Sequence, residues 1–282
     1  MNLPIKPESL KGKVVVVTGA GGVICGAMAK AIASCGAKVA VLDLSLEKAE
    51  AISKEIVAEG GIAKAYKNNV LDRDDLKKVH AEINADFGKI DILINGAGGN
   101  SPKATTSQEY YAEKQSEEEI SFFDLKQEGV EFVFDLNFMG TFLPCQEFAR
   151  DMLGRKGCSI LNVSSMNAFT PLTKIPAYSA AKSSVSNFTK WLAVHFSKTG
   201  IRVNAIAPGF LVTAQNQALL YNLDGTPTAR TEKILAATPM DRFGDPAELL
   251  AATLFLIDDG CSSFITGVVL PIDGGFSSYA GV

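Results

Sequence analysis

Residues 13–43 most constrain the fold of this chain, because they have the pattern of a strand, a glycine turn, a helix and a second strand. Residues 13–18 (KVVVVT) form a continuous β-branched run, and the helical pattern ICGAMAKAIASCG follows the turn at 19–22. A second apolar run, 38–42, ends at Asp43. Short apolar strands that alternate with helices are typical of parallel sheets. This stretch therefore predicts an α/β chain.

The glycine turn at 19–22 is typical of a phosphate-binding corner. Unpaired backbone N–H groups and the helix dipole face an anion at such a helix N-terminus. Asp43 follows about 20 residues later, the separation of the acidic residue that binds a ribose hydroxyl in dinucleotide-binding folds. An aspartate at this position also suits the N-cap of the next helix, and one residue can serve both purposes.

The alternation of strands and helices continues along the chain. We expect further helices at 46–59, 72–87, 132–148, from 177 onward and at 246–257, and further strands at 63–67, 90–94, 159–163, 201–207 and 268–272. The 282 residues, 47% of them hydrophobic, are enough for one large core. The sequence thus predicts a single α/β domain over residues 1–282, a doubly wound parallel sheet with helices on both faces.

Residues 160–190 hold a serine, a tyrosine and a lysine in a pattern that suits proton transfer. Tyr178 and Lys182 are four residues apart on a predicted helix, so they share one face. A tyrosine pKa of about 10 must fall to about 7 for base catalysis, and a cation at about 4 Å supplies the required ~4 kcal/mol at an effective dielectric of about 20. Ser165 follows a buried strand, where open α/β sheets bind ligands. An isolated pair of this spacing is more often ordinary helix surface.

Together with the glycine turn and the NGAG segment at 95–98, these residues resemble the short-chain dehydrogenase/reductase family, from about residue 10 to 275. The resemblance implies a Rossmann-fold oxidoreductase in which NADH delivers a hydride to a ketone. Tyr178 would exchange the proton, Lys182 would tune Tyr178 and hold the nicotinamide ribose, and Ser165 would hydrogen-bond the substrate oxygen. Asn137 would hold a water in a proton relay from Lys182.

The resemblance also implies a set of cofactor contacts. Asn69 would touch the adenine, and Thr213 would lie near the phosphates. The expected set is Gly19, Gly22, Val23, Ile24, Asp43, Asn69, Val70, Asn95, Ala97, Gly98, Tyr178, Lys182, Pro208, Gly209 and Thr213. Because Asp43 would repel a 2′-phosphate and no arginine follows at 44 or 45, we expect NAD(H) rather than NADP.

The glycine turn departs from the family pattern TGxxxGxG. Val23 and Cys25 stand at the two later glycine positions, and Gly96 stands where relatives have an asparagine. A side chain at each of these two positions should tighten or shift the phosphate pocket. The departure leaves open a different class of function, a dinucleotide-binding sensor without turnover, although the intact catalytic set favours an enzyme.

Within the family, the chain is similar to the branch that interconverts D-fructuronate and D-mannonate. This similarity implies a sugar-acid substrate; the alternative is another polyol or sugar-acid dehydrogenase, such as a gluconate 5-dehydrogenase. Residues 210–245 resemble a substrate lid, and the longer segment 100–131 is a candidate wall of the site, whose aromatic residues predict that it packs on something. Amides and hydroxyls suited to sugar hydroxyls are Asn100, Asn167, Ser101 and Thr170, and cations for a carboxylate are Lys103, Lys174 or Arg242.

Charge and composition exclude several classes of partner. The net charge of −4 gives no basic surface for nucleic acid, and no apolar run reaches the roughly 18 residues that a membrane span requires. Five cysteines without a CxxC pair favour the cytoplasm, and two distant histidines predict no metal site. The small-residue face of the Tyr178 helix and the family resemblance favour a homo-dimer or homo-tetramer.

Overall fold

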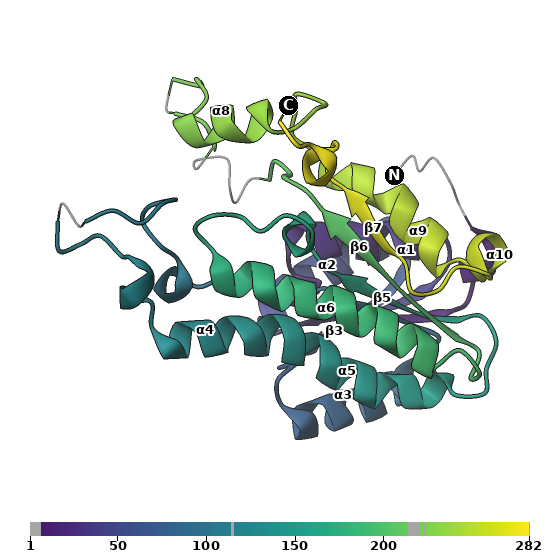
Figure 1. Cartoon of the computed structure of the whole chain (residues 1–282). Coiled ribbons are helices and arrows are strands. Elements are labelled where there is room, and N and C mark those ends of the chain that lie inside the picture. Colours follow the sequence, from purple (N-terminus) through teal and green to yellow (C-terminus); the bar gives the residue numbers. More distant parts are fainter. Residues whose placement is uncertain (1–6, 114–115, 214–219, 223, 282) are drawn as a thin grey trace.

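In the computed structural model, which describes residues 7–113, 116–213, 220–222 and 224–281, one sheet forms the centre of the molecule (Figure 1). Its seven parallel strands have the order β3-β2-β1-β4-β5-β6-β7. The strands are β1 (Val14–Thr18), β2 (Lys38–Asp43), β3 (Ile62–Lys67), β4 (Ile92–Asn95), β5 (Cys158–Val163), β6 (Ile201–Pro208) and β7 (Val269–Ile272). This order confirms the predicted doubly wound sheet.

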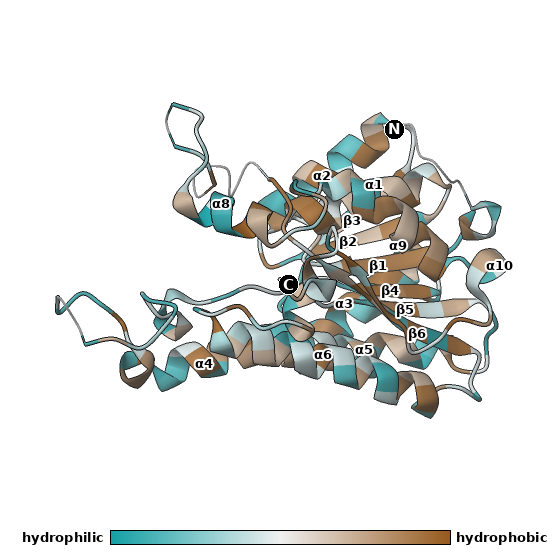
Figure 2. Ribbon diagram, turned by 45° about the horizontal axis from the view of Figure 1, so that its top comes forward, coloured by the Kyte–Doolittle hydropathy of each residue, from teal (hydrophilic) through white to brown (hydrophobic). Residues whose placement is uncertain are grey.

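Helices cover both faces of the sheet. On one face lie α1 (Val23–Ser34), α2 (Leu46–Ala58) and α9 (Leu250–Ile257), and on the other lie α3 (Arg73–Asp86), α5 (Gly140–Phe148) and α6 (Pro176–His195). The remaining α-helices of the described chain are α4 (Gln127–Phe134), α8 (Ala229–Ala236) and α10 (Asp259–Ser262). Figure 2 shows the apolar strands enclosed between these layers. Within the described residues, no helix is long and apolar enough to cross a membrane.

Strand β1 explains why its sequence is a continuous apolar run. Val15 and Val17 pack in the core under α1, whereas Val14 and Val16 pack in the core under α3 and α5. All four are buried because the strand is covered on both faces. The strand therefore lacks the polar alternation of a half-exposed strand.

The predicted helix at 132–148 is interrupted. Helix α4 runs into a π-helical segment at Asp135–Met139, and α5 continues from Gly140. Such π-turns inside α-helices occur frequently at functional sites, because they displace one residue from the regular hydrogen-bonding pattern. Asn137 lies at the centre of this π-helical segment.

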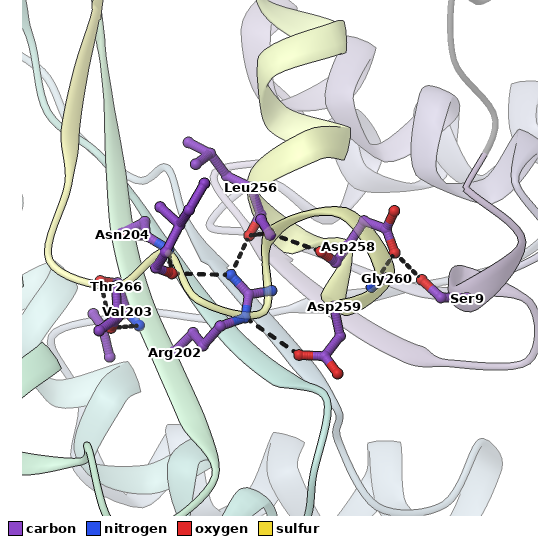
Figure 3. Close-up of polar contacts among 11 residues, drawn as sticks. Ser9, Arg202, Val203, Asn204, Leu256, Asp258, Asp259, Gly260 and Thr266 are labelled. Atoms are coloured by element: carbon purple, nitrogen blue, oxygen red, sulfur yellow. Dashed lines mark hydrogen bonds and ion pairs between the residues drawn. The ribbon is translucent and has the colours of Figure 1, made fainter.

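A buried arginine holds the C-terminal part of the chain against the sheet (Figure 3). The guanidinium of Arg202 on β6 donates to the carbonyls of Leu256 (2.8 Å) and Ile265 (3.3 Å), and its Nε lies 3.5 Å from Asp259. Neighbouring Asp258 accepts hydrogen bonds from the Gly260 N–H and the Ser9 hydroxyl. These contacts join α9 and α10 to β6 and to the N-terminal segment.

Segment 100–131 extends outward beyond the N-terminal end of α6 (Figure 1). It is attached to that end by the Thr106 N–H, which donates to the Lys174 carbonyl at 2.9 Å. Three of its aromatic residues pack on one another, Tyr111 and Phe122 each against Phe123, but all four aromatic side chains are largely exposed. Their exposed fractions are 80% for Tyr110, 72% for Tyr111, 67% for Phe122 and 79% for Phe123. Part of the expected lid, residues 214–219 and 223, lies outside the described residues.

Candidate active site

The site forms where the strand order reverses, between β1 and β4. The turn after β1 and the turn after β4 approach each other so closely that a Cβ on Gly19 would lie 2.9 Å from the Ala97 Cα and N. Gly19 also has a φ of +65°, which side chains rarely adopt. Open α/β sheets bind ligands outside the carboxyl ends of the strands at such a reversal.

A cavity of about 670 Å³ lies above this reversal. Its wall includes the N-terminus of α1, where Gly22 is the N-cap and no side chain caps the helix, so backbone N–H groups are available to an anion. Eleven of the predicted cofactor residues line the cavity: Gly19, Gly22, Val23, Ile24, Asp43, Asn69, Val70, Ala97, Gly98, Gly209 and Thr213. The donor groups and the volume fit a dinucleotide.

Asp43 ends β2 beside this cavity, and backbone donors hold its carboxylate. Oδ2 accepts from the Gly21 N–H at 3.0 Å, and Oδ1 accepts from the Ser45 N–H at 2.9 Å. The N-cap of α2 is Ser45, which accepts from the Lys48 N–H, so the capping alternative for Asp43 is wrong. The carboxylate is thus fixed at the position where dinucleotide-binding folds hold a ribose.

Four predicted cofactor residues are not part of this lining: Tyr178 and Lys182, which are described below, and Asn95 and Pro208. Asn95 is buried, and its amide donates to the Asn162 side chain at 2.8 Å and to the Cys145 sulfur at 3.2 Å, inside the sheet. Pro208 ends β6 and is not part of the lining. The lining residues that the sequence did not identify are Gly21, Cys25, Leu42, Leu44, Lys48, Asn68, Gly96, Leu136, Phe210 and Leu211. Gly21, Cys25 and Gly96 belong to the glycine-rich segments that the sequence indicates, whereas no local pattern indicates the others.

Two of the departures from the family pattern, Cys25 and Gly96, pack against each other. The Cys25 sulfur, on α1, occupies the space above Gly96, where a Cβ on Gly96 would lie only 2.0 Å from it and 3.0 Å from the Thr18 carbonyl oxygen. Burial raises the pKa of the Cys25 thiol to about 12, so the thiol is neutral and acts as a filling group. A bulkier residue at position 25 is thus accommodated by a glycine at position 96.

This packing predicts that Gly96→Ala weakens folding by about 1–3 kcal/mol, the usual cost of overpacking. Cys25→Ala in the same chain should restore most of that loss, because it removes the sulfur that the new methyl group meets. Urea unfolding of the two single variants and the double variant measures the coupling. Gly99→Ala is the control, since its Cβ would meet the Leu136 side chain at an ordinary 3.4 Å. If Gly96→Ala lowers the free energy of unfolding equally in the wild type and in the Cys25→Ala variant, the Cys25 sulfur does not cause the loss.

The predicted catalytic residues come together beside the cavity. Lys182 is buried on α6, and its Nζ donates to the Val163 carbonyl at 2.8 Å and lies 5.7 Å from the centre of the Tyr178 ring. Ser165, two residues beyond β5, hydrogen-bonds the Tyr178 side chain. A Cβ on Gly98, which lines the cavity, would lie 3.2 Å from Lys182 Nζ. The three predicted catalytic residues therefore lie next to this cavity, which we call the dinucleotide cavity.

The protonation states differ from the sequence-based expectation. Burial raises the pKa of Tyr178, and the hydrogen bond from Ser165 offsets only part of this rise. The Lys182 ammonium donates to the Val163 carbonyl. Burial also lowers the pKa of Lys182 to about 8. Tyr178 is thus a phenol at neutral pH, ready to act as an acid.

Asn137 is fully buried in the π-helical segment and fixes the turn after β4. Its Nδ2 donates to the Gly99 carbonyl at 2.7 Å and to the Val133 carbonyl at 2.8 Å, and its Oδ1 accepts from the Gly99 N–H at 3.3 Å. The side chain therefore positions the backbone next to Lys182.

The predicted substrate residues differ in burial and in hydrogen bonding. Asn100 is exposed and donates to the Thr105 hydroxyl, whereas Asn167 is buried with an Oδ1 that has no hydrogen-bond partner in the described part of the chain. Two of the predicted cations are engaged, Lys103 by Glu128 at 3.4 Å and Arg242 by Glu248 at 2.7 Å. Across the described ranges, no group of three His, Cys, Asp or Glu residues is arranged to hold a metal ion.

Comparisons with known proteins agree with this geometry. The short chain dehydrogenase family model matches residues 13–223. An uncharacterized oxidoreductase of Haemophilus influenzae is 59% identical over 98% of this chain and 96% of its own. The structure of a proposed Haemophilus D-mannonate oxidoreductase with bound NAD has a TM-score of 0.95 and 59% identity, and the match covers 97% of this chain and 98% of that chain. A Burkholderia cenocepacia gluconate 5-dehydrogenase in complex with NADP and tartrate has a TM-score of 0.82 and 26% identity, over 98% and 99% of the two chains. This chain therefore belongs to the short chain dehydrogenase family and is an oxidoreductase.

Proposed function

We propose that this protein is an NAD-dependent oxidoreductase that interconverts D-fructuronate and D-mannonate. The observation that carries this proposal is the likeness, over 97% of the chain, to the NAD-bound protein that was itself proposed to be a D-mannonate oxidoreductase. The position of Ser165, Tyr178 and Lys182 beside the dinucleotide cavity supports the same chemistry. A ketone at the end of this cavity would lie next to a proton donor.

Tyr178 acts as the acid when the ketone is reduced. Its raised pKa keeps the proton on the phenol until negative charge develops on the substrate oxygen. Ser165, already hydrogen-bonded to Tyr178, contacts the same oxygen and orients the substrate. Lys182, whose pKa is about 8, is largely charged at neutral pH and stabilises the phenolate that remains.

NAD, when bound, supplies or accepts the hydride. The N–H groups at the start of α1 would hold its pyrophosphate, and Asp43 would accept from its ribose hydroxyls. Val70 and Asn69 would flank the adenine, and Lys182 would hold the second ribose. Asn137 acts indirectly, since it fixes the backbone at Gly99, next to the Gly98 wall of the cavity.

The proposed function also bears on the partners and the location of the protein. The substrate of the proposed reaction is a small sugar acid. We propose no nucleic-acid or membrane partner. We place the protein in the cytoplasm, since all five cysteines are free. A homo-dimer or homo-tetramer is proposed, because Trp191 and Val194 on α6 leave 57% and 75% of their surface exposed.

A substrate panel tests the proposed activity. Purified protein with NADH or NAD is assayed against D-fructuronate, D-mannonate, D-tagaturonate, 5-keto-D-gluconate, D-gluconate and simple polyols. We expect D-fructuronate to give the highest kcat/KM of the ketones, at least about tenfold above its isomers, because one misplaced hydroxyl leaves a polar group of the site unpaired.

Other outcomes separate the alternatives. The highest kcat/KM on 5-keto-D-gluconate would make the protein a gluconate 5-dehydrogenase, with the same catalytic residues. Preference for a neutral polyol would remove the sugar-acid class. NADH binding without turnover of any compound in the panel would support the sensor.

A further inference from the structure

A second cavity, of about 450 Å³, lies between α8 and the loop that leads into α6. Phe210 lines both this cavity and the dinucleotide cavity, so the two adjoin. The lining of the second cavity is rich in cations: Lys174 comes from the loop, and Arg230 and Lys233 come from α8. Glu109, from segment 100–131, is the one acidic side chain of its described lining.

The charges in this cavity do not balance. Glu109 pairs with Lys233 at 2.8 Å, and this hydrogen bond holds the pKa of Glu109 below its usual value. Lys174 and Arg230 form no ion pair with any described residue, although the charge of Lys174 also helps to lower the pKa of Glu109. Three cationic side chains and one carboxylate leave a formal surplus of two positive charges, which favours an anionic ligand.

The cavity lies at the start of the helix that carries Tyr178. Lys174 lies two residues before Pro176, the first residue of α6, and Tyr178 lies two residues after it. Its carbonyl accepts from the Thr106 N–H, which fixes the loop. The ends of a six-carbon sugar acid are about 6 Å apart, from bond lengths of about 1.5 Å. A substrate with its ketone at Tyr178 can therefore place its carboxylate up to about 6 Å from that residue.

We infer that the second cavity is the subsite for the substrate carboxylate, with Lys174 and Arg230 as its cations. The inference rests on the proposed sugar-acid function and adds the residues that select the acid over a neutral sugar. It favours these two residues over Lys103 and Arg242, whose charges are engaged by Glu128 and Glu248. The guanidinium of Arg230 suits bidentate binding of a carboxylate.

The test uses Lys174→Gln, Arg230→Gln and the double variant, with Lys103→Gln as a control of the same charge change outside the cavity. Each single variant should raise the KM for D-fructuronate about tenfold, and the double variant about 100-fold, with little change in kcat. Lys174→Arg should restore most of the affinity, and Kd for NADH should stay unchanged. In a parallel measurement, D-mannonate is titrated calorimetrically into the NADH-loaded protein.

The outcomes distinguish this inference from the proposed function. If D-fructuronate is a good substrate and the double variant keeps the wild-type KM, the subsite is wrong and the function stands. If no sugar acid is turned over but D-mannonate binds the wild type and not the double variant, the subsite stands and the activity is wrong. Equal losses in Lys103→Gln and Lys174→Gln would show only a general charge effect and would overturn the assignment.

Discussion

Replacing Tyr178 with phenylalanine is expected to lower kcat by about 100-fold to 10,000-fold, the usual contribution of a positioned acid or base. The ring of Tyr178 remains on α6, so only the hydroxyl that Ser165 contacts is lost. Kd for NADH should stay within a factor of about 2, because the cavity lining is untouched. Steady-state kinetics and NADH fluorescence titration measure the two quantities.

The pH profile supplies an independent readout of the same residue. Reduction needs the protonated phenol, and the pKa of Tyr178 is raised, so the rate of reduction is full at neutral pH and is lost as the pH rises through that pKa. Lys182 loses its proton at about pH 8, which begins the decline. Oxidation needs the opposite state and rises with pH. A Phe variant that keeps a tenth of the wild-type kcat, or the wild-type profile, would remove Tyr178 from the mechanism.

The fold was predictable because its determinants are local. The continuous apolar run at 14–17 is typical of a strand buried on both faces, and the glycine turn at 19–22 marks the start of a helix. The helix capped by Asp72 begins within one residue of its predicted start, since an N-cap aspartate is a strong signal. Each of these signals lies within a few residues of the element that it specifies.

Features that depend on contacts between distant segments were not predictable. The π-helical turn at Asn137 depends on a hydrogen-bonded contact with Gly99, 38 residues away in the sequence. The sequence shows that Cys25 departs from the glycine pattern, but it does not show that the Cys25 sulfur packs above Gly96. The pKa of Tyr178 is raised by burial of its phenol, whereas the spacing of Tyr178 and Lys182 indicates only that the two share a helix face.

Asp43→Asn is expected to lower the preference for NADH over NADPH by up to about 1000-fold. A carboxylate about 4 Å from a 2′-phosphate costs up to about 4 kcal/mol at an effective dielectric of about 20, and ~1.4 kcal/mol corresponds to a factor of ten. The amide cannot accept from both the Gly21 and Ser45 N–H groups, so some loss with NADH is also expected. The measurement is the ratio of kcat/KM values for the two cofactors.

Lys48 also lines the dinucleotide cavity and carries a positive charge. A Cβ on Gly21 would lie 2.6 Å from the Lys48 Cβ and 2.8 Å from Asp43 Oδ2, so the base of the Lys48 side chain lies near the Asp43 carboxylate, and both residues line the dinucleotide cavity. Once Asp43 is neutral, Lys48 should attract the 2′-phosphate, and adding Lys48→Gln should reverse most of the gain with NADPH. Asp72→Asn, at a helix N-cap outside the cavity, is the matched control and should leave the ratio unchanged. A wild-type protein with the higher kcat/KM for NADPH would mean that Lys48 already outweighs Asp43.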